Sequence, residues 1–360
     1  MTCLLRIDLK ALTRSVFLLV FIAAAGCTPR SQPQALSVVP QGHTATRQVT
    51  ITVATTRARD ASTASYSDLR APKLNYEMFT ISIPPTHKIS EIEWPKSQPN
   101  PQTSFAVTDR RELPDFALNA GKRDILIFVH GYNYTFAESL FRLAQVAADA
   151  DLKESPVLFA WPSAASVTGY VADKDAVTYS RDDLVHLLTV VAADPAIENI
   201  TLFGHSMGGW LVAEALRQLR LSGQHKVIDR LGNVVLAAPD IDIDVFRRQV
   251  QTIGKLNPPI TLLVSPDDRA LKLSERLAGS RGRVGTRDAN DPRVQALAAA
   301  HGIRVIDISK VDAPDGSNHN RFAALMKVLP RATKTTFASL AHAGSFILEP
   351  ASATLVSSNK

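Results

Sequence analysis

The pentapeptide Gly204-His205-Ser206-Met207-Gly208 holds a serine between two glycines in the pattern G-x-S-x-G. An apolar run at residues 200–203 precedes it, and a helical pattern at 208–221 follows it. A strand, a sharp turn and a helix in this order are typical of a nucleophile elbow, where glycines let neighbouring backbone approach a strained serine. The sequence therefore predicts that Ser206 is a nucleophile for acyl transfer.

A serine hydroxyl attacks only when a base in reach takes its proton, and nine histidines are available. His319 lies on the loop after the last predicted strand, residues 303–308, a position that suits a catalytic base. His342 is the alternative, although no strand precedes it. His205 stands beside the nucleophile on a tight turn, and we expect it to pack rather than to react.

The base in turn needs a carboxylate that fixes its tautomer and stabilises the imidazolium. Asp240 follows the predicted strand 234–238, whereas Asp267 and Asp268 follow the predicted strand 260–264. We favour Asp268, because the acid of such a triad usually follows the second strand after the nucleophile. Asp267 is a close competitor, although Pro-Asp-Asp also suits a simple turn.

Acyl transfer also requires hydrogen-bond donors for the oxyanion that develops. His130-Gly131-Tyr132-Asn133 follows the first core strand, predicted at residues 124–129. We expect the backbone N–H of Tyr132 to supply one donor and that of Met207, the residue after the nucleophile, to supply the other. The alternative for the side chains of Tyr132 and Asn133 is that they form only local hydrogen bonds.

The elements that must position these residues alternate strictly from residue 124 onward. Such alternation predicts an α/β protein with a mostly parallel central sheet and helices on both faces, and with the elbow it indicates the α/β-hydrolase fold. Ligands in such sheets bind beyond the carboxyl ends of the strands, where the predicted site residues lie. The predicted strands span residues 48–55, 77–83, 124–129, 157–161, 200–203, 234–238, 260–264 and 303–308, and the predicted helices span 136–150, 181–193, 208–221, 271–278 and 293–300.

Two segments outside this alternation carry further expectations. Residues 93–115 are rich in proline and read as a surface connection, and a helical stretch at 241–253 could form a cap over the site. The acidic residues at 240–244 lack the spacing of a calcium loop and are expected to form a solvated face. The sequence shows no phosphate-binding glycine loop either. We therefore predict no metal, nucleotide or flavin cofactor.

The N-terminus has the features of an export signal. Three basic residues precede an apolar stretch at residues 15–25, and Ala24-Ala25-Gly26 leads directly into Cys27. This arrangement resembles the lipobox of bacterial lipoproteins, in which the cysteine is acylated and becomes the mature N-terminus. We therefore predict a protein that is exported and lipid-anchored to the bacterial cell envelope, at the outer membrane or the periplasmic side. A plain secretory signal is the alternative.

The sequence divides into four predicted parts. Residues 1–26 form the signal, 27–48 a flexible tether, 49–330 the α/β-hydrolase domain and 331–360 a C-terminal extension. The only two cysteines are at positions 3 and 27, so the predicted mature domain has no disulfide and no thiol nucleophile. The formal net charge is +6, with basic and acidic residues interspersed, which makes nucleic acid a poor candidate partner.

Five segments of the sequence together resemble a family of bacterial α/β hydrolases in the esterase/lipase superfamily that is grouped under a domain of unknown function. The resemblance covers about residues 50–325. It implies that the acid is Asp268, which stands before Arg-Ala-Leu, and that the base is His319. The segments are Phe128-Val129-His130-Gly131-Tyr132-Asn133, Phe159-Ala160-Trp161-Pro162-Ser163, Gly204-His205-Ser206-Met207-Gly208, Leu236-Ala237-Ala238-Pro239-Asp240 and Ser265-Pro266-Asp267-Asp268-Arg269-Ala270-Leu271.

These features predict a carboxylic ester hydrolase that works through an acyl-enzyme. One alternative is a lipase or phospholipase, because a lipid anchor would place the site near membrane lipids. Another is an exported binding protein that keeps the fold without the chemistry. The expected partners are a small-molecule or lipid ester and the membrane that holds the anchor. The sequence does not indicate the oligomeric state.

Overall fold

A computed structural model describes residues 33–39, 47–60, 65–118 and 124–325 of the protein. Contacts divide the chain into residues 1–32 and 33–360, and every described residue belongs to the second unit. The predicted signal, Cys27, His342 and the C-terminal extension lie outside the described residues. None of the helices in the described ranges has the length and apolar character needed to span a membrane.

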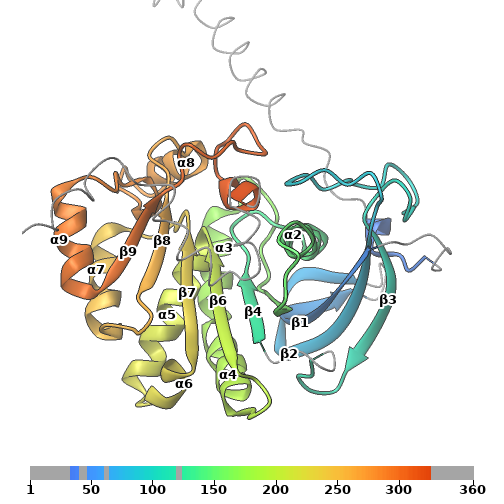
Figure 1. Ribbon diagram of the computed structural model, residues 1–360, viewed down its shortest axis with the longest axis horizontal. Coiled ribbons are helices and arrows are strands. Elements are labelled where there is room, and N and C mark those ends of the chain that lie inside the picture. The colour runs from blue at the N-terminus through green and yellow to red at the C-terminus, as the bar shows by residue number, and fades with distance from the viewer. Residues whose placement is uncertain (1–32, 40–46, 61–64, 119–123, 326–360) are drawn as a thin grey trace, which may run out of the picture. The chain divides into compact units, whose positions relative to one another are not determined.

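Strands and helices alternate along most of this unit (Figure 1). The strands are β1 Arg47–Asp60, β2 Ser65–Ile83, β3 Ala106–Leu113, β4 Asp124–Val129, β5 Ser155–Ala160, β6 Asn199–His205, β7 Leu231–Ala237, β8 Ile260–Val264 and β9 Ile303–Asp307. The helices are α2 Phe136–Asp149, α3 Tyr170–Tyr179, α4 Arg181–Ala193, α5 Met207–Leu221, α6 His225–Asp229, α7 Ile243–Ile253, α8 Arg269–Leu277 and α9 Pro292–His301. Three short 3₁₀ helices are η1 Pro33–Leu36, η2 Val284–Thr286 and η3 Arg321–Ala324.

In the described part of the chain the strands form one sheet in the order β3-β2-β1-β5-β4-β6-β7-β8-β9. All neighbours from β1 to β9 are parallel, whereas β2 is antiparallel to both β1 and β3. The predicted fold class, a mostly parallel sheet covered by helices on both faces, is therefore confirmed. Because β6, β8 and β9 are parallel, the loops that carry Ser206, Asp268 and His319 leave the sheet at the same edge.

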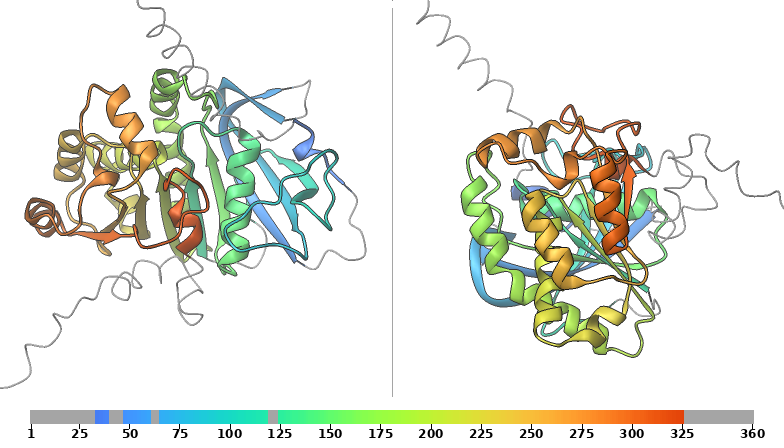
Figure 2. Two further views of the ribbon diagram at one scale, coloured as in Figure 1. Left: turned by 90° about the horizontal axis from the view of Figure 1, so that it is seen from above. Right: turned by 90° about the vertical axis from the view of Figure 1, so that its left-hand side faces the viewer.

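The central strands are apolar throughout because both of their faces are buried. Along β4, Leu126 and Phe128 pack into the core beneath α2, whereas Ile125 and Ile127 pack into the core beneath α4, α5 and α7. Successive side chains of a strand point to opposite faces, so a strand between two helical layers needs a continuous apolar run. Figure 2 shows helices on both sides of the sheet, with more of them on the α4, α5 and α7 side.

Residues 93–115 were predicted to form a proline-rich surface connection. This prediction is wrong for residues 106–113, which form β3. This strand pairs only with β2 and lies at the edge of the sheet (Figure 1). Its second half carries charged side chains, for example Arg110, which pairs with the buried carboxylate of Glu77 on β2 at 2.6 Å. An edge strand with charges lacks the apolar alternation by which strands are recognised in sequence.

Residues 33–39 also depart from expectation, because the segment 27–48 was expected to be a flexible tether. Residues 33–36 form η1, and the side chains of Ala35 and Leu36 are buried in the core. The backbone N–H of Val39 donates to the carbonyl of Val107 on β3. A few apolar contacts thus order a segment that has no periodic pattern of its own.

Helix α3 was not predicted, and its amphipathic pattern is weak. Its buried side chains include Tyr170 and the carboxylate of Asp173. Asp173 accepts hydrogen bonds from Ser163 Oγ at 2.6 Å, from Ala164 N at 2.6 Å and from Asn133 N at 3.2 Å. It therefore ties together the loops after β4 and β5, which approach the candidate site.

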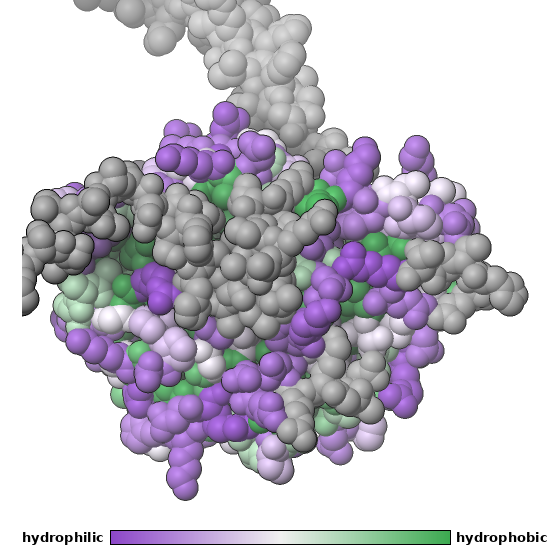
Figure 3. Space-filling model, viewed as in Figure 1, coloured by the Kyte–Doolittle hydropathy of each residue, from purple (hydrophilic) through white to green (hydrophobic). Residues whose placement is uncertain are grey.

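On the face shown in Figure 3, hydrophilic residues surround small, separate apolar patches.

Candidate active site

Ser206 occupies the sharp turn between β6 and α5, with φ 54° and ψ −121°. A positive φ is unusual for a residue with a Cβ and costs of order 1–3 kcal/mol, so neighbouring structure must hold it. The Ser206 N–H donates to the carbonyl of Ala237 at 2.9 Å, and the Ser206 carbonyl accepts from the N–H of Asp240 at 3.1 Å. The sequence prediction of a strained serine between a strand and a helix agrees with this geometry.

The two glycines of the pentapeptide make this turn possible. A Cβ on Gly204 would lie 2.7 Å from the Cα of Gly209. A Cβ on Gly208 would overlap the backbone carbonyl oxygens of Val129 and His130, at the end of β4. These neighbours are backbone atoms of α5 and of the end of β4, and they cannot yield as a flexible side chain would. The start of α5 therefore packs against the end of β4 only because residue 208 has no side chain.

Replacing Gly208 with alanine is expected to destabilise the fold by about 3 kcal/mol or more, because the new methyl group overpacks against the backbone of β4. Helix propensity favours alanine by about 1 kcal/mol and cannot offset this. Chemical denaturation of the full chain measures the loss. Gly232→Ala is the matched control, since its Cβ would have only an ordinary contact at 3.6 Å. Equal stability of the two variants would contradict this account of the elbow.

His319 and Asp268 form a hydrogen-bonded pair, with Nδ1 of the imidazole 2.7 Å from Oδ2 of the carboxylate. The Asp268 side chain is fully buried, and that of His319 is 14% exposed. The other carboxylate oxygen, Oδ1, accepts from the backbone N–H of Leu271 at 2.9 Å and caps α8. A carboxylate at Nδ1 favours the tautomer with its proton there, which leaves Nε2 free to accept a proton.

Asp267, the competitor of Asp268 in the sequence, has different partners. Both of its carboxylate oxygens bind the guanidinium of Arg321, at 2.5 and 2.9 Å. Its Oδ1 also accepts from Ser265 Oγ at 2.7 Å, and its Oδ2 accepts from Asn318 Nδ2 at 2.9 Å. The hydrogen bonds from Arg321 lower the pKa of Asp267 to about 2. Asp267 thus fastens the loop that carries His319 onto the turn that carries Asp268.

Arg321 is a part of the site that the sequence analysis missed. Its side chain is buried, and it also donates to Ser265 Oγ at 2.6 Å. A bidentate pair between arginine and carboxylate fixes geometry as well as charge. Asp267 and Arg321 are 54 positions apart, and no local pattern marks the arginine. The only available signal was its place two residues after His319.

His205 lies beside His319. The two imidazole rings have centroids 4.6 Å apart, and His205 Nε2 is 3.3 Å from the carbonyl oxygen of His319. The ring also packs 4.5 Å from that of Phe322. Burial, and next the positive charge that His319 can carry, hold the pKa of His205 well below its ordinary value of 6.5. His205 is therefore a neutral packing residue.

The loop after β4 passes directly against the nucleophile. A Cβ on Gly131 would lie 2.9 Å from the Cβ of Ser206. The next residue, Tyr132, donates its hydroxyl to the carbonyl of Ser166 at 2.9 Å and also contacts the carbonyl of Val167. The side chain of Tyr132 is thus held by the loop after β5, 34 and 35 positions away in the sequence. Met207, which would supply the second oxyanion donor, is the first residue of α5.

The solvated acidic face expected at residues 240–244 is wrong for Asp240. Its side chain is buried and forms an ion pair with the buried Arg283, Nε to Oδ1 at 3.1 Å. It also accepts from the hydroxyls of Tyr170 at 3.0 Å and Ser274 at 2.9 Å. A buried carboxylate needs such partners, and they come from segments far from it in sequence. Asp242, by contrast, caps the N-terminus of α7.

Within the described residues, no group of histidine, cysteine, aspartate and glutamate side chains could hold a metal ion. The structure pairs His319 with Asp268, and the pair of Asp267 and Arg321 fastens their two loops together. The arrangement suits nucleophilic attack by an alcohol with a histidine as base.

No curated protein matches the chain. Among solved structures, a putative hydrolase from Agrobacterium vitis S4 is 12% identical, covers 71% of this chain and 94% of its own, and has a TM-score of 0.34. An esterase from Rhizomucor miehei is 13% identical over 92% of this chain and 93% of its own, with a TM-score of 0.33. Ferulic acid esterase from Streptomyces cinnamoneus is 13% identical over 75% of each chain, with a TM-score of 0.33. The model of one family, described as alpha/beta hydrolase of unknown function (DUF900), matches residues 108–335, and the chain belongs to this family.

Proposed function

We propose that this protein is a carboxylic ester hydrolase that uses Ser206, His319 and Asp268 as a catalytic triad. The observation that carries the proposal is the 2.7 Å hydrogen bond between His319 and the buried Asp268, on loops that leave the same sheet edge as the strained Ser206. Membership of an α/β-hydrolase family supports hydrolysis as the reaction class. The ester specificity rests on the chemistry of the residues.

In the proposed mechanism, Ser206 Oγ attacks the ester carbonyl carbon while its proton passes to His319 Nε2. The carbonyl oxygen becomes an oxyanion, which accepts hydrogen bonds from the backbone N–H groups of Tyr132 and Met207. The C–O bond to the alcohol then breaks, and the alcohol leaves with the proton from His319. Water attacks the acyl-enzyme in the same way, with His319 as base, and releases the carboxylic acid and free Ser206. Asp268 stabilises the imidazolium at each stage.

An active-site probe tests this proposal directly. A fluorophosphonate should phosphonylate the purified full chain, and mass spectrometry of its peptides should place the adduct on Ser206. The matched control is protein denatured before exposure to the probe, which should not react because an isolated serine hydroxyl is a weak nucleophile. No adduct, or an adduct on another residue, would reject the triad and favour an exported binding protein without this chemistry.

The pH dependence of hydrolysis gives a second test. Burial alone lowers the pKa of His319, but the carboxylate of Asp268 outweighs it, so the net pKa lies above the ordinary 6.5. The base works only in its neutral form, which is populated above its pKa. We expect kcat/KM to fall as the pH decreases through a midpoint above 6.5. A midpoint well below that value, measured on a neutral ester, would contradict the His319–Asp268 pair.

A series of esters with increasing acyl-chain length tests which size of substrate the proposed site prefers. Activity on short, soluble p-nitrophenyl esters that declines with acyl length would support a small-ester esterase. Higher activity on long acyl chains presented in micelles or vesicles would support the lipase or phospholipase alternative. Both outcomes keep the same nucleophile.

A further inference from the structure

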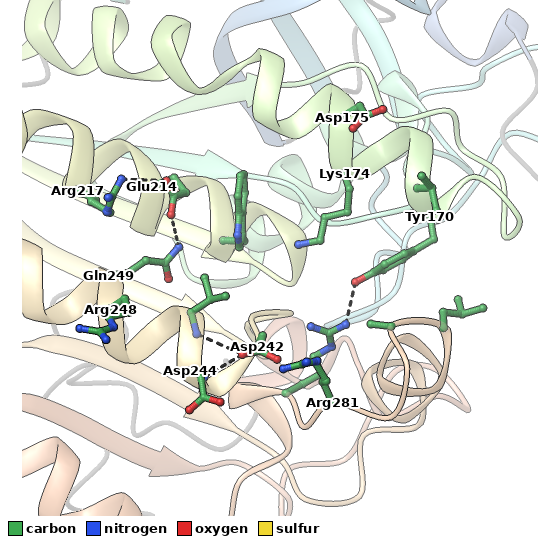
Figure 4. A pocket seen from close by; sticks show the side chains of 16 residues that line it. Tyr170, Lys174, Asp175, Glu214, Arg217, Asp242, Asp244, Arg248, Gln249 and Arg281 are labelled. Carbon is green, nitrogen blue, oxygen red and sulfur yellow. Dashed lines mark hydrogen bonds and ion pairs between the residues drawn. The ribbon is translucent and has the colours of Figure 1, made fainter.

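A cavity of about 900 Å³ opens on the helical side of the sheet, between α3, α5, α7 and the segment after α8. Ser206, His319 and Asp268 do not line it. Its volume is in the range of pockets that hold small organic ligands, about 300–1,000 Å³. Figure 4 shows polar side chains from these elements converging on the cavity. The residues of the proposed triad are thus not part of this cavity.

The carboxylates around this cavity are largely engaged by the protein. Glu214 accepts a hydrogen bond from Gln249 at 2.7 Å, and Asp244 pairs with Arg247 at 2.9 Å. Asp242 accepts from two backbone N–H groups at the start of α7. Asp175 is exposed and turned away from the other labelled side chains in Figure 4. These acids are thus directed into the protein or into solvent.

Two further side chains that line the cavity, Lys174 and Arg281, are cationic. Lys174 on α3 extends toward the cavity, and its Nζ lies 4.8 Å from the ring centroid of Trp210 (Figure 4). Neither Lys174 nor Arg281 forms an ion pair with a carboxylate of the residues that the structure describes. Burial lowers the pKa of Lys174, and attraction to the carboxylates of Asp240, Glu214 and Asp242 offsets only part of this effect. An anion placed beside it would recover the lost solvation.

The rim of the cavity is apolar and open to solvent. Val171 is 74% exposed, Leu277 is 55% exposed and Val245 is 42% exposed, and all three line this cavity. They come from three different helices, α3, α8 and α7, whose exposed aliphatic side chains meet at one place. Exposed aliphatic residues that gather around a concave surface mark an interaction site more often than scattered ones do. The cavity thus combines an apolar rim with two cations that form no direct ion pair in the described part of the chain.

We propose that this cavity binds a single-chain anionic amphiphile, namely an alkyl carboxylate. The carboxylate would accept hydrogen bonds from Lys174 and Arg281, and the alkyl chain would lie on Val171, Val245 and Leu277. This binding does not depend on the reactivity of Ser206. The site is therefore an addition to the proposed esterase function and can be tested without any activity.

Calorimetric titration of the full chain with decanoate, below its micelle concentration, tests the proposal. We expect binding of decanoate, much weaker binding of butyrate, which lacks the chain, and much weaker binding of decanol, which lacks the charge. Lys174→Gln should weaken decanoate binding about tenfold or more, the size expected for a hydrogen bond between charged groups. The matched control is Lys153→Gln, which removes the same charge from an exposed lysine outside the cavity.

A second readout locates the ligand. Trp210 lies in the wall of the cavity. A bromine atom on a bound ligand quenches a nearby tryptophan, so 10-bromodecanoate should quench the tryptophan fluorescence of the protein. Trp210→Phe should abolish most of this quenching. Quenching that survives in Trp210→Phe, or decanoate binding unchanged in Lys174→Gln, would overturn the proposal. Equal binding of decanol and decanoate would also overturn it, because the cations would then have no role.

Discussion

Replacing Ser206 with alanine is expected to reduce kcat for ester hydrolysis by about 10⁶-fold, the loss seen when a serine nucleophile is removed from a triad. The remaining histidine and oxyanion donors can only assist water, and no acyl-enzyme can form. Steady-state hydrolysis of p-nitrophenyl acetate by the full chain measures the effect. Because alanine removes only a hydroxyl group, we expect the variant to fold and to denature as the parent does.

The matched control for this substitution is Ser222→Ala. Ser222 lies at the other end of α5, where its hydroxyl bonds to the carbonyls of Gln218 and Leu219 and accepts from Gln224 Nε2. The control should keep the activity of the parent. Residual activity of Ser206→Ala within tenfold of the parent, in protein free of a contaminating esterase, would reject Ser206 as the nucleophile.

Asp268→Asn is expected to lower kcat by about 10⁴-fold, the cost of an amide at the acid position of a serine triad. Asparagine is the same size, but its NH₂ group cannot accept the Nδ1 proton of His319. The imidazole then favours the tautomer with its proton on Nε2, where it cannot act as a base. The side-chain oxygen of asparagine can still accept from the N–H of Leu271, so the cap of α8 is preserved and denaturation should change little.

Asp267→Asn is the matched control, because it makes the same change one residue earlier. Asp267 binds Arg321 and does not bond to His319, and its side chain is 49% exposed. We expect a loss of kcat of no more than about tenfold, caused by a looser His319 loop. If Asp267→Asn proved more damaging to kcat than Asp268→Asn, the assignment of the acid would be reversed.

The sequence by itself determined the scaffold and the strand, turn and helix that hold Ser206. β4, β5, β6 and β8 are buried on both faces, so their apolar runs are visible without knowledge of their neighbours. Much of the elbow is equally local, because the positive φ at Ser206 and the close approach of Gly204 to Gly209 involve residues within the same turn. Prediction failed where an element depends on distant partners, as with the charged edge strand β3.

Only the tertiary structure shows which of the two adjacent acids contacts His319. Asp267 and Asp268 are adjacent in one turn, and both follow the right strand. Their roles differ because the loop at 315–321 brings His319 to one carboxylate and Arg321 to the other. Asp240 was likewise predicted to be a surface acid, but in the structure it is buried against Arg283 and Tyr170. A local pattern encodes backbone geometry and burial, whereas the partner of a charged side chain is fixed by how loops far apart in sequence meet in space.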